Sequence, residues 1–200
     1  MSTQFAKQYL SEAKTILEQI DAVELDKMTE LLVNLRNQKG RLFFVGVGGG
    51  AGHASHAVND FRKIAGIESY SPADNVSELT ARTNDEGWET TYAAWLQVSN
   101  LNAKDMLFVF SVGGGDAERN ISANIVNALK LAKEKGCKII GVVGRDGGYT
   151  AKVADACVIV ATVNKDYITP HTESFQALVW HLLVSDPRLQ QMSNKWESQK

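Results

Sequence analysis

Hydrophobic side chains recur every three or four residues along the first forty positions of the chain. Between Gln4 and about Ile20 this spacing predicts a helix with one apolar face. The positions on that face are Phe5, Tyr9, Leu10, Ala13, Ile16, Leu17 and Ile20. A second helix is predicted from about Leu25 to Gln38, and its inward positions are Met28, Leu31, Leu32 and Leu35. Gly40 follows this helix, as glycine commonly does just beyond a helix C-terminus.

From residue 41 onward, short apolar runs alternate with helical patterns. The apolar runs predict strands at Arg41–Gly46, Met106–Ser111, Lys138–Val143 and Cys157–Ala161, with a weaker one at Ile67–Ser69. Helices are predicted at Ala51–Ala65, Ser77–Arg82, Glu86–Val98, Ala117–Lys135 and Tyr149–Ala154, with a long one from about Thr172. Short apolar strands between helices are typical of a parallel sheet that helices cover on both faces.

We therefore expect an α/β fold of three layers, α/β/α, with a five-stranded parallel sheet preceded by an N-terminal helical pair. No flexible linker separates the pair from the first strand. The prediction is a single domain over residues 1–200, made of the pair in 1–39 and an α/β core in 40–200 that ends in a long helix. We expect the polar tail from Asn194 to Lys200 to fray.

Glycines gather where three of the predicted strands end. Ligands of parallel α/β sheets collect at the carboxyl ends of the strands. Glycine-rich backbone before a helix suits an anion, because free N–H groups and the helix dipole point the same way. The alternative is that the glycines only form tight turns and let helices pack closely. The clusters are Gly48-Gly49-Gly50, Gly113-Gly114-Gly115, and Gly144 with Gly147-Gly148.

The second of these loops adds polar groups to the edge of the sheet. Ser111 ends the strand before it, and Ser122-Ala123-Asn124 is placed to cap the main body of the next helix. Arg119 adds a charge, although a solvated arginine is the more ordinary interpretation. Two such loops at one edge favour a polar or anionic ligand over plain turns.

Composition narrows the function classes. The chain has 200 residues and a net charge of −2, without a long basic run, which argues against nucleic-acid binding by a basic face. No uncharged apolar run approaches a membrane span, and the first residues lack a signal-peptide pattern. We therefore expect a cytoplasmic protein, in which Cys137 and Cys157 are reduced core residues.

His56 and Asp60 lie on a predicted helix that follows the first glycine loop. Four residues correspond to about 40° of rotation, so both side chains face one side. The plainer alternative is an ordinary surface pair, which stabilises a helix only slightly. His53, one turn earlier, is a spare candidate of the same kind.

Glu173 and His181 share a broad face of the last helix, among apolar neighbours. A glutamate and a histidine in such a helix need partners, because unpaired buried charge is expensive. The alternative is that Glu173 lies near the exposed helix start and His181 is a core histidine with its hydrogen bonds made. With His56 and Asp60 they form a plausible divalent-metal set, since zinc takes imidazole nitrogen and carboxylate oxygen.

The polar segment around Asn84 and Asp85 is the last candidate. Capping of the next helix is the simplest role for this pair. Arg82, just before it, is also placed to reach a ligand.

These motifs together resemble the sugar isomerase (SIS) domain family, and within it the phosphoheptose isomerases, over nearly the whole chain. That family has a Gly-Asn-Gly-Gly-Ser loop followed by His-x-x-x-Glu, an Asn-Asp-x-Gly element, a Ser-rich phosphate loop, a Thr-Gly-Lys-Asp-Gly-Gly turn, and a Gln with a His eight residues later. The corresponding segments are Gly46–Gly50, His56–Asp60, Asn84–Gly87, Ser111–Gly114 continued at Ser122–Asn124, Val143–Gly148, and Glu173 with His181.

The resemblance implies a flavodoxin-like SIS fold and an aldose–ketose isomerase of a phosphorylated sugar. The implied reaction converts sedoheptulose 7-phosphate to heptose 7-phosphate, for lipopolysaccharide or surface glycans, through a metal-assisted enediol. Asp60 would be the base and His181 the acid or base at the oxygens. The implied zinc ligands are His56, Asp60, Glu173 and His181. The implied substrate and phosphate contacts are Gly48, Gly49, Gly50, Asn84, Asp85, Ser111, Gly113 and Ser122. A homotetramer with active sites between subunits is also implied.

Some positions depart from the family pattern. Asp60 replaces the family Glu and Glu173 replaces the Gln, so the implied ligand set keeps its capacity to bind metal. Val47, Gly50, Val112 and Gly113 replace polar residues of the two loops, which leaves the exact phosphosugar open. The alternatives are an isomerase of another phosphosugar, or a non-catalytic SIS regulator or assembly factor that binds a sugar phosphate.

Overall fold

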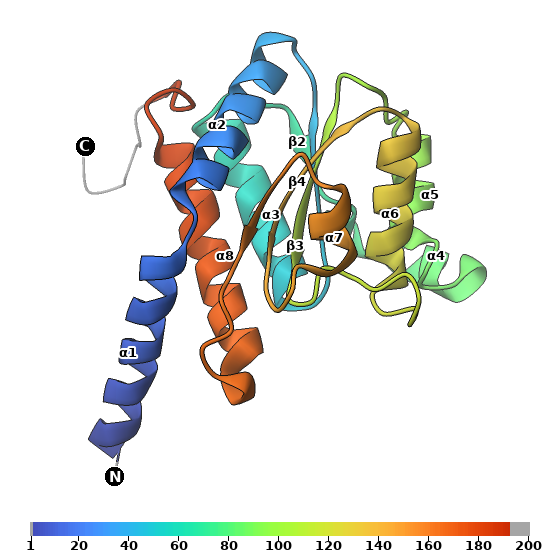
Figure 1. Ribbon diagram of the computed structural model, residues 1–200. Helices are drawn as coiled ribbons and strands as arrows, with labels where there is room; N and C mark the ends of the chain where they lie inside the picture. Colours follow the sequence, from blue (N-terminus) through green and yellow to red (C-terminus); the bar gives the residue numbers. More distant parts are fainter. Residues whose placement is uncertain (1, 193–200) are drawn as a thin grey trace.

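A computed structural model describes residues 2–192, and within them five parallel strands form one sheet (Figure 1). The strands stand in the order β2-β1-β3-β4-β5. Their bounds are β1 Leu42–Gly46, β2 Ser69–Tyr70, β3 Met106–Ser111, β4 Lys138–Val143 and β5 Ala156–Ile159. The predicted α/β class and five-stranded parallel sheet are confirmed. The assignment of residues 1–200 to one domain stays a prediction, and the tail from Asn194 lies outside the described residues.

Helices cover both faces of the sheet, as Figure 1 shows. On one face lie α2 (Ala22–Asn37), α3 (Gly49–Lys63) and α8 (Ile168–Ser185). On the other face lie α5 (Thr91–Val98), α6 (Ala123–Glu134) and α7 (Gly148–Val153), with α4 (Val76–Glu86) beside α5. The remaining helix, α1 (Ser2–Gln19), extends beyond the body of the molecule, with the start of α8 beside it.

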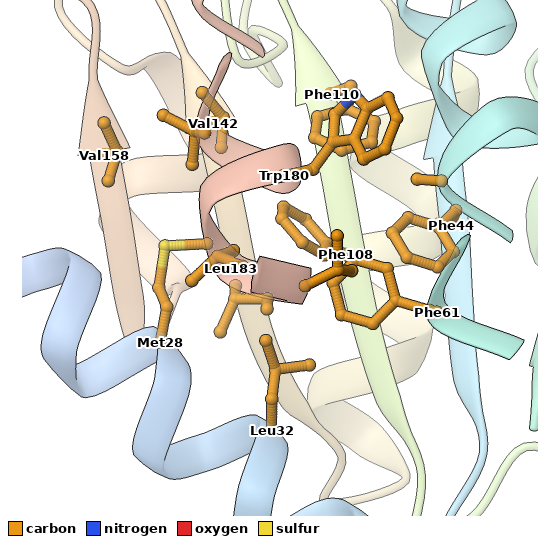
Figure 2. Close-up of a cluster of buried hydrophobic side chains, with 14 of the residues drawn as sticks. Met28, Leu32, Phe44, Phe61, Phe108, Phe110, Val142, Val158, Trp180 and Leu183 are labelled. Atoms are coloured by element: carbon orange, nitrogen blue, oxygen red, sulfur yellow. The ribbon is translucent and has the colours of Figure 1, made fainter. Parts of the chain in front are cut away.

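Side chains of β3 alternate between two hydrophobic cores, one on each face. Phe108 packs in the core under α2, α3 and α8, whereas Leu107 and Val109 pack under α5 and α6. Figure 2 shows the rings of Phe44, Phe61 and Phe108 gathered in the first core. A strand buried on both faces explains why its sequence is an unbroken apolar run.

One predicted helix boundary is wrong: Ala117–Lys135 is helical only from Ala123. A carboxylate oxygen of Asp116 accepts the N–H groups of Glu118 and Arg119, which folds the segment into a turn. Ser122 precedes the helix with a φ of 50°, a left-handed conformation that an α-helix cannot include. Its hydroxyl makes no capping hydrogen bond, so the expected side-chain cap is absent.

The proposed cap at Asn84 and Asp85 is also wrong. Both residues lie in α4, which runs to Glu86, and the next helix begins at Thr91. Gly87 separates the two helices with a φ of 90°, which glycine adopts without strain. The other predicted helices and strands overlap their observed bounds.

The first helix is fixed to α8 by a polar contact. His171 is buried, and its Nε2 lies 2.9 Å from a carboxylate oxygen of Glu12. The ring of Tyr9 stacks on His171 at 4.3 Å between centroids. Hydrogen bonds from His171 and Asn164 lower the pKa of Glu12 to about 2. This contact anchors the helix that carries Glu173 and His181.

Asp105 ties the start of β3 to the start of β1. Its carboxylate accepts hydrogen bonds from the backbone and guanidinium of Arg41 and from Asn102, and the side chain is 2% exposed. We expect Asp105→Ala to lower the free energy of unfolding by about 3 kcal/mol or more. The substitution leaves a partly buried guanidinium and several N–H groups without their hydrogen-bond acceptor. Urea denaturation measures this loss.

Asp26 provides the matched control. It pairs with Arg188 at 2.7 Å but is 56% exposed, so Asp26→Ala should cost less than about 1 kcal/mol. Equal losses for the two variants would contradict the assignment of Asp105 as a structural carboxylate.

The two cysteines are free thiols, as predicted. Burial raises the pKa of both Cys137 and Cys157 to about 12, so neither is a thiolate near neutral pH. No helix within residues 2–192 is both long and apolar enough to cross a membrane.

Candidate functional site

Two adjacent helices bring three predicted site residues together. Within the first hydrophobic core α3 and α8 pack side by side (Figure 1). His56 and Asp60 from α3 meet His181 from α8, and one ligand atom from each lies within 4.8 Å of the others. We call these three residues the His–Asp cluster. Two segments more than a hundred residues apart in sequence thus form one site.

The Asp60 carboxylate stands opposite both imidazoles. Its Oδ2 lies 3.9 Å from His56 Nε2 and 4.0 Å from His181 Nε2, too far for direct hydrogen bonds. Its Oδ1 accepts a hydrogen bond from Asn59 Nδ2 at 2.7 Å. One carboxylate oxygen is therefore held by the protein while the other faces the two rings.

A backbone hydrogen bond determines the tautomer of His181. Its Nδ1 lies 2.8 Å from the carbonyl oxygen of Ala177, one turn earlier on α8. A carbonyl only accepts, so Nδ1 donates the proton and the neutral ring keeps an open lone pair on Nε2. That lone pair is the one on the side of Asp60.

One side of the cluster packs against a buried aromatic ring, and the other side is exposed to solvent. Trp180 is fully buried, and its ring meets the His56 ring edge to face at 4.7 Å between centroids. The side chains of His56 and His181 are 58% and 53% exposed, and that of Asp60 is 14% exposed. A small molecule or a second chain can therefore reach the two rings.

This donor set suits a divalent transition metal such as zinc. Imidazole nitrogen and carboxylate oxygen are zinc ligands, and ligand atoms around tetrahedral zinc lie roughly 3.4 Å apart. The observed separations of 3.9 and 4.0 Å are close to that spacing. The backbone hydrogen bond on His181 Nδ1 is the kind that orients a metal-ligating histidine. The three residues of the His–Asp cluster therefore fit a zinc ion.

Glu173 lies at the other end of α3, outside this group. Its carboxylate occupies the space in front of Gly49, at the helix N-terminus, where a side chain would collide with it. A negative charge is favourable there because of the helix dipole. His53 is near: burial lowers its pKa, and the charge of Glu173 opposes that shift. The role of Glu173 as a fourth metal ligand stays a prediction.

The first glycine loop combines close packing with access to solvent. A side chain at Gly50 would collide with the carbonyl of Phe110, and Gly48 has a φ of 59°. Gly48 and Gly49 are nevertheless exposed, next to the N-terminus of α3. The packing alternative is therefore true in part, and the exposed backbone at Gly48, where no other atom lies within 4 Å of the position a side chain would take, remains open to a ligand.

The second glycine loop lies against the turn after β4. A side chain at Gly114 would collide with the backbone of Gly147, so both loops approach closely because neither carries a side chain there. The Ser111 hydroxyl accepts the N–H of Gly114 at 3.0 Å, which shapes the loop. Gly113, beside it, is half-buried.

Asn84 and Asp85 stand apart from the His–Asp cluster. Both are exposed on α4, where the Asn84 amide donates to the Asp85 carboxylate at 2.7 Å. No hydrogen bond or ion pair among the described residues joins them to the cluster. Their contact with a substrate, like those of Ser111, Gly113 and Ser122, stays a prediction.

Three residues of the site were not predicted as part of it. These are Asn59, which holds Asp60; Ala177, whose carbonyl orients His181; and Trp180, which backs His56. A backbone carbonyl leaves no signal in a sequence. From the sequence alone, Trp180 would be interpreted as an ordinary core residue, because it lies in an apolar run.

Known proteins resemble this chain along most of its length. Residues 8–144 match the SIS domain family. A phosphoheptose isomerase of a Nitratiruptor species is 33% identical over 157 residues, which are 76% of this chain and 77% of that protein. The lincomycin biosynthesis protein LmbN of Streptomyces lincolnensis is 32% identical over 164 residues, 77% of this chain but 58% of that protein.

A solved structure extends the likeness to the fold. The phosphoheptose isomerase GmhA from Neisseria gonorrhoeae superposes with a TM-score of 0.77 at 24% identity, covering 92% of this chain and 97% of that one. Fold and site together define a three-layer α/β protein whose cluster of candidate ligands bridges two helices. The chain belongs to the SIS domain family, so the resemblance seen in the sequence is confirmed.

Proposed function

We propose that the protein is an aldose–ketose isomerase that converts sedoheptulose 7-phosphate to a heptose 7-phosphate. One observation carries the proposal. In an SIS chain related to phosphoheptose isomerases, the Asp60 carboxylate faces two accessible imidazoles, one of which has its Nε2 lone pair free. The product would serve lipopolysaccharide or other surface glycans.

Aldose–ketose isomerisation moves a proton between C1 and C2 of the sugar. Asp60 would remove and return that proton through its Oδ2, because Asn59 holds Oδ1. His181 would exchange a proton with the substrate oxygens through Nε2, since Nδ1 is engaged with Ala177. Positioned acid–base groups of this kind accelerate a reaction by about 10²–10⁴-fold.

The glycine loops would hold the phosphate and so orient the reacting carbons. The proposed contacts are Gly48, Gly49, Gly50, Ser111, Gly113 and Ser122, with Asn84 and Asp85 at the sugar. Exposure of Gly48 beside a helix N-terminus supports this role of the first glycine loop.

His56, Asp60 and His181 would hold one zinc ion per chain, with Glu173 as the fourth residue of the set. Asp60 Oδ2 and His181 Nε2 are the free donor atoms of their side chains, so each would have to leave the ion before it could take up a proton. When bound, the ion would polarise the carbonyl and stabilise negative charge on the oxygens. The fit of the three donors supports this part of the proposal.

Measuring the metal content of the purified protein tests the proposed zinc site directly. Protein purified without chelator should contain about one zinc per chain, because the three donors already lie near zinc spacing. His56→Ala should reduce that content strongly, whereas His53→Ala should not. Full activity of chelator-treated protein without zinc would remove the metal from the account.

We also propose a cytoplasmic homotetramer with active sites between subunits. The openness of the cluster supports a neighbouring chain, as do the exposed apolar side chains of α1, Phe5, Leu10 and Leu17. Light scattering after gel filtration measures the mass of the assembly.

The changed loops support a second candidate. Val47 and Val112 bring no hydroxyl to the phosphate, and LmbN is as similar to this chain as a phosphoheptose isomerase is. The chain would then isomerise another phosphosugar, or bind one as a regulator without converting it. A panel of sugar phosphates, each scored by thermal shift and by NMR for conversion, tests both candidates. Stabilisation without conversion of any member would favour the regulator.

A further inference from the structure

A buried tyrosine hydroxyl joins α5 to the base of the first glycine loop. Tyr92 stands in the first turn of α5 and is 1% exposed. Its hydroxyl donates a hydrogen bond to the carbonyl oxygen of Gly46 at 2.5 Å. A buried hydroxyl without a partner is costly, so this bond fixes the end of the side chain against the carboxyl end of β1.

The surroundings of Tyr92 leave its hydroxyl one role, that of donor to Gly46. Burial raises the pKa of Tyr92 to about 12, so the hydroxyl keeps its proton near neutral pH. The ring packs in the core under α5 and α6 and meets the ring of Trp88 edge to face, at 5.8 Å between centroids. Packing therefore holds the ring, and the hydroxyl holds the carbonyl.

Gly46 is the point from which the first glycine loop departs. It is the last residue of β1, and a side chain there would collide with the backbone of Gly50, so the chain folds back tightly. Gly50 in turn lies against the carbonyl of Phe110 in β3. The loop is thus fixed at both ends, by Tyr92 at Gly46 and by close packing at Gly50.

Between these two ends the loop has few contacts of its own. Val47 and Gly48 are exposed. The N–H of Gly48 donates no hydrogen bond to any residue in the described part of the chain. A short segment with so few contacts takes its conformation from the points that hold it. The bond from Tyr92 therefore helps to determine where the exposed N–H of Gly48 points.

We propose that Tyr92 is a positioning residue, whose hydroxyl holds the first glycine loop in the conformation that receives the ligand. That the loop receives a ligand rests on the proposed function, whereas the holding of the loop does not. Tyr92 itself touches no ligand, because its oxygen is buried and engaged with Gly46. A loop that is ordered beforehand lowers the cost of binding.

Hydrogen exchange in Tyr92→Phe tests whether the hydroxyl holds the loop. The substitution deletes one oxygen and keeps the ring. The amides of Gly50 and Gly52 donate to carbonyls of the loop, and they should exchange about tenfold faster, as expected for one lost hydrogen bond. The amide of Gly40, in a turn at the other end of β1, should keep its wild-type rate. Unchanged rates in the loop, or equal acceleration at Gly40, would overturn the proposal.

Steady-state kinetics with sedoheptulose 7-phosphate tests the effect on the ligand. Tyr92→Phe should raise KM at least about fivefold, because fewer molecules hold the loop ready to bind. At saturation kcat should stay within a factor of about 2, since bound substrate holds the loop in place. A fall in kcat with unchanged KM would overturn the positioning role. A wild-type protein that converts none of this sugar would refute the proposed function, and the exchange rates would still decide whether Tyr92 holds the loop.

Tyr70→Phe is the matched control. Tyr70 also donates through its hydroxyl, to a carboxylate oxygen of Glu68 at 2.8 Å. It is exposed, however, and lies in β2 at the edge of the sheet. This variant should leave both the exchange rates of the loop and KM at their wild-type values. Effects of equal size in the two variants would contradict the assignment of Tyr92.

Discussion

Replacing Asp60 with asparagine is expected to reduce kcat for sedoheptulose 7-phosphate by about 10²–10⁴-fold. Asparagine keeps the size of the side chain but cannot accept a proton at neutral pH. The hydrogen bond from Asn59 does not require the charge. The protein should therefore keep its fold, which circular dichroism and thermal melting would check, while turnover is lost.

Asp74→Asn is the control for this variant. Asp74 accepts a hydrogen bond from Ser55, on the same helix as Asp60, but lies outside the His–Asp cluster. Its loss should leave kcat within a factor of about 2, as for a surface substitution that touches no reacting group. Equal turnover by the Asp60 variant and the wild-type protein would remove Asp60 from the mechanism.

The largest expected effect on stability comes from Phe108→Ala. The Phe108 ring is fully buried, with the rings of Phe44 and Phe110 at 5.2 and 4.7 Å between centroids. Its removal leaves a cavity in the middle of the sheet, on the face covered by α2, α3 and α8. The free energy of unfolding should fall by about 3–5 kcal/mol, measured by urea denaturation.

Phe5→Ala deletes the same ring from a different environment. Phe5 is 51% exposed on α1, so its loss should cost less than about 1 kcal/mol. A loss for Phe108→Ala no larger than that of the control would mean that the core around β3 collapses into the cavity or is not packed as described.

The strands and most helices could be predicted because burial leaves a pattern of apolar residues in the sequence. Burial on one face leaves a periodic pattern, and burial on both faces leaves an unbroken apolar run. Phe108 and its neighbours are apolar without a break because both sides of β3 are covered. The segment after Asp116 could not be predicted in this way. Its residues suit a helix, but a side-chain turn at Asp116 and left-handed backbone at Asn120 and Ser122 delay the helix.

Part of the candidate site was also accessible from sequence alone. His56 and Asp60 share one side of a helix by spacing, and the structure confirms that they face each other. Their meeting with His181 depends on how α3 packs against α8, which no local pattern encodes. The Glu173 carboxylate lies against Gly49, a position that also depends on how α8 packs against α3 and that spacing along one helix cannot predict.

The main proposal is that the His–Asp cluster isomerises sedoheptulose 7-phosphate. NMR of wild-type protein mixed with sedoheptulose 7-phosphate in deuterated water tests it most directly. We expect heptose 7-phosphate signals to appear and the aldose to carry solvent deuterium at C2, because the proton passes through a carboxylate with some access to water. If sedoheptulose 7-phosphate binds the protein but remains unconverted, the His–Asp cluster is not an isomerase site for this sugar.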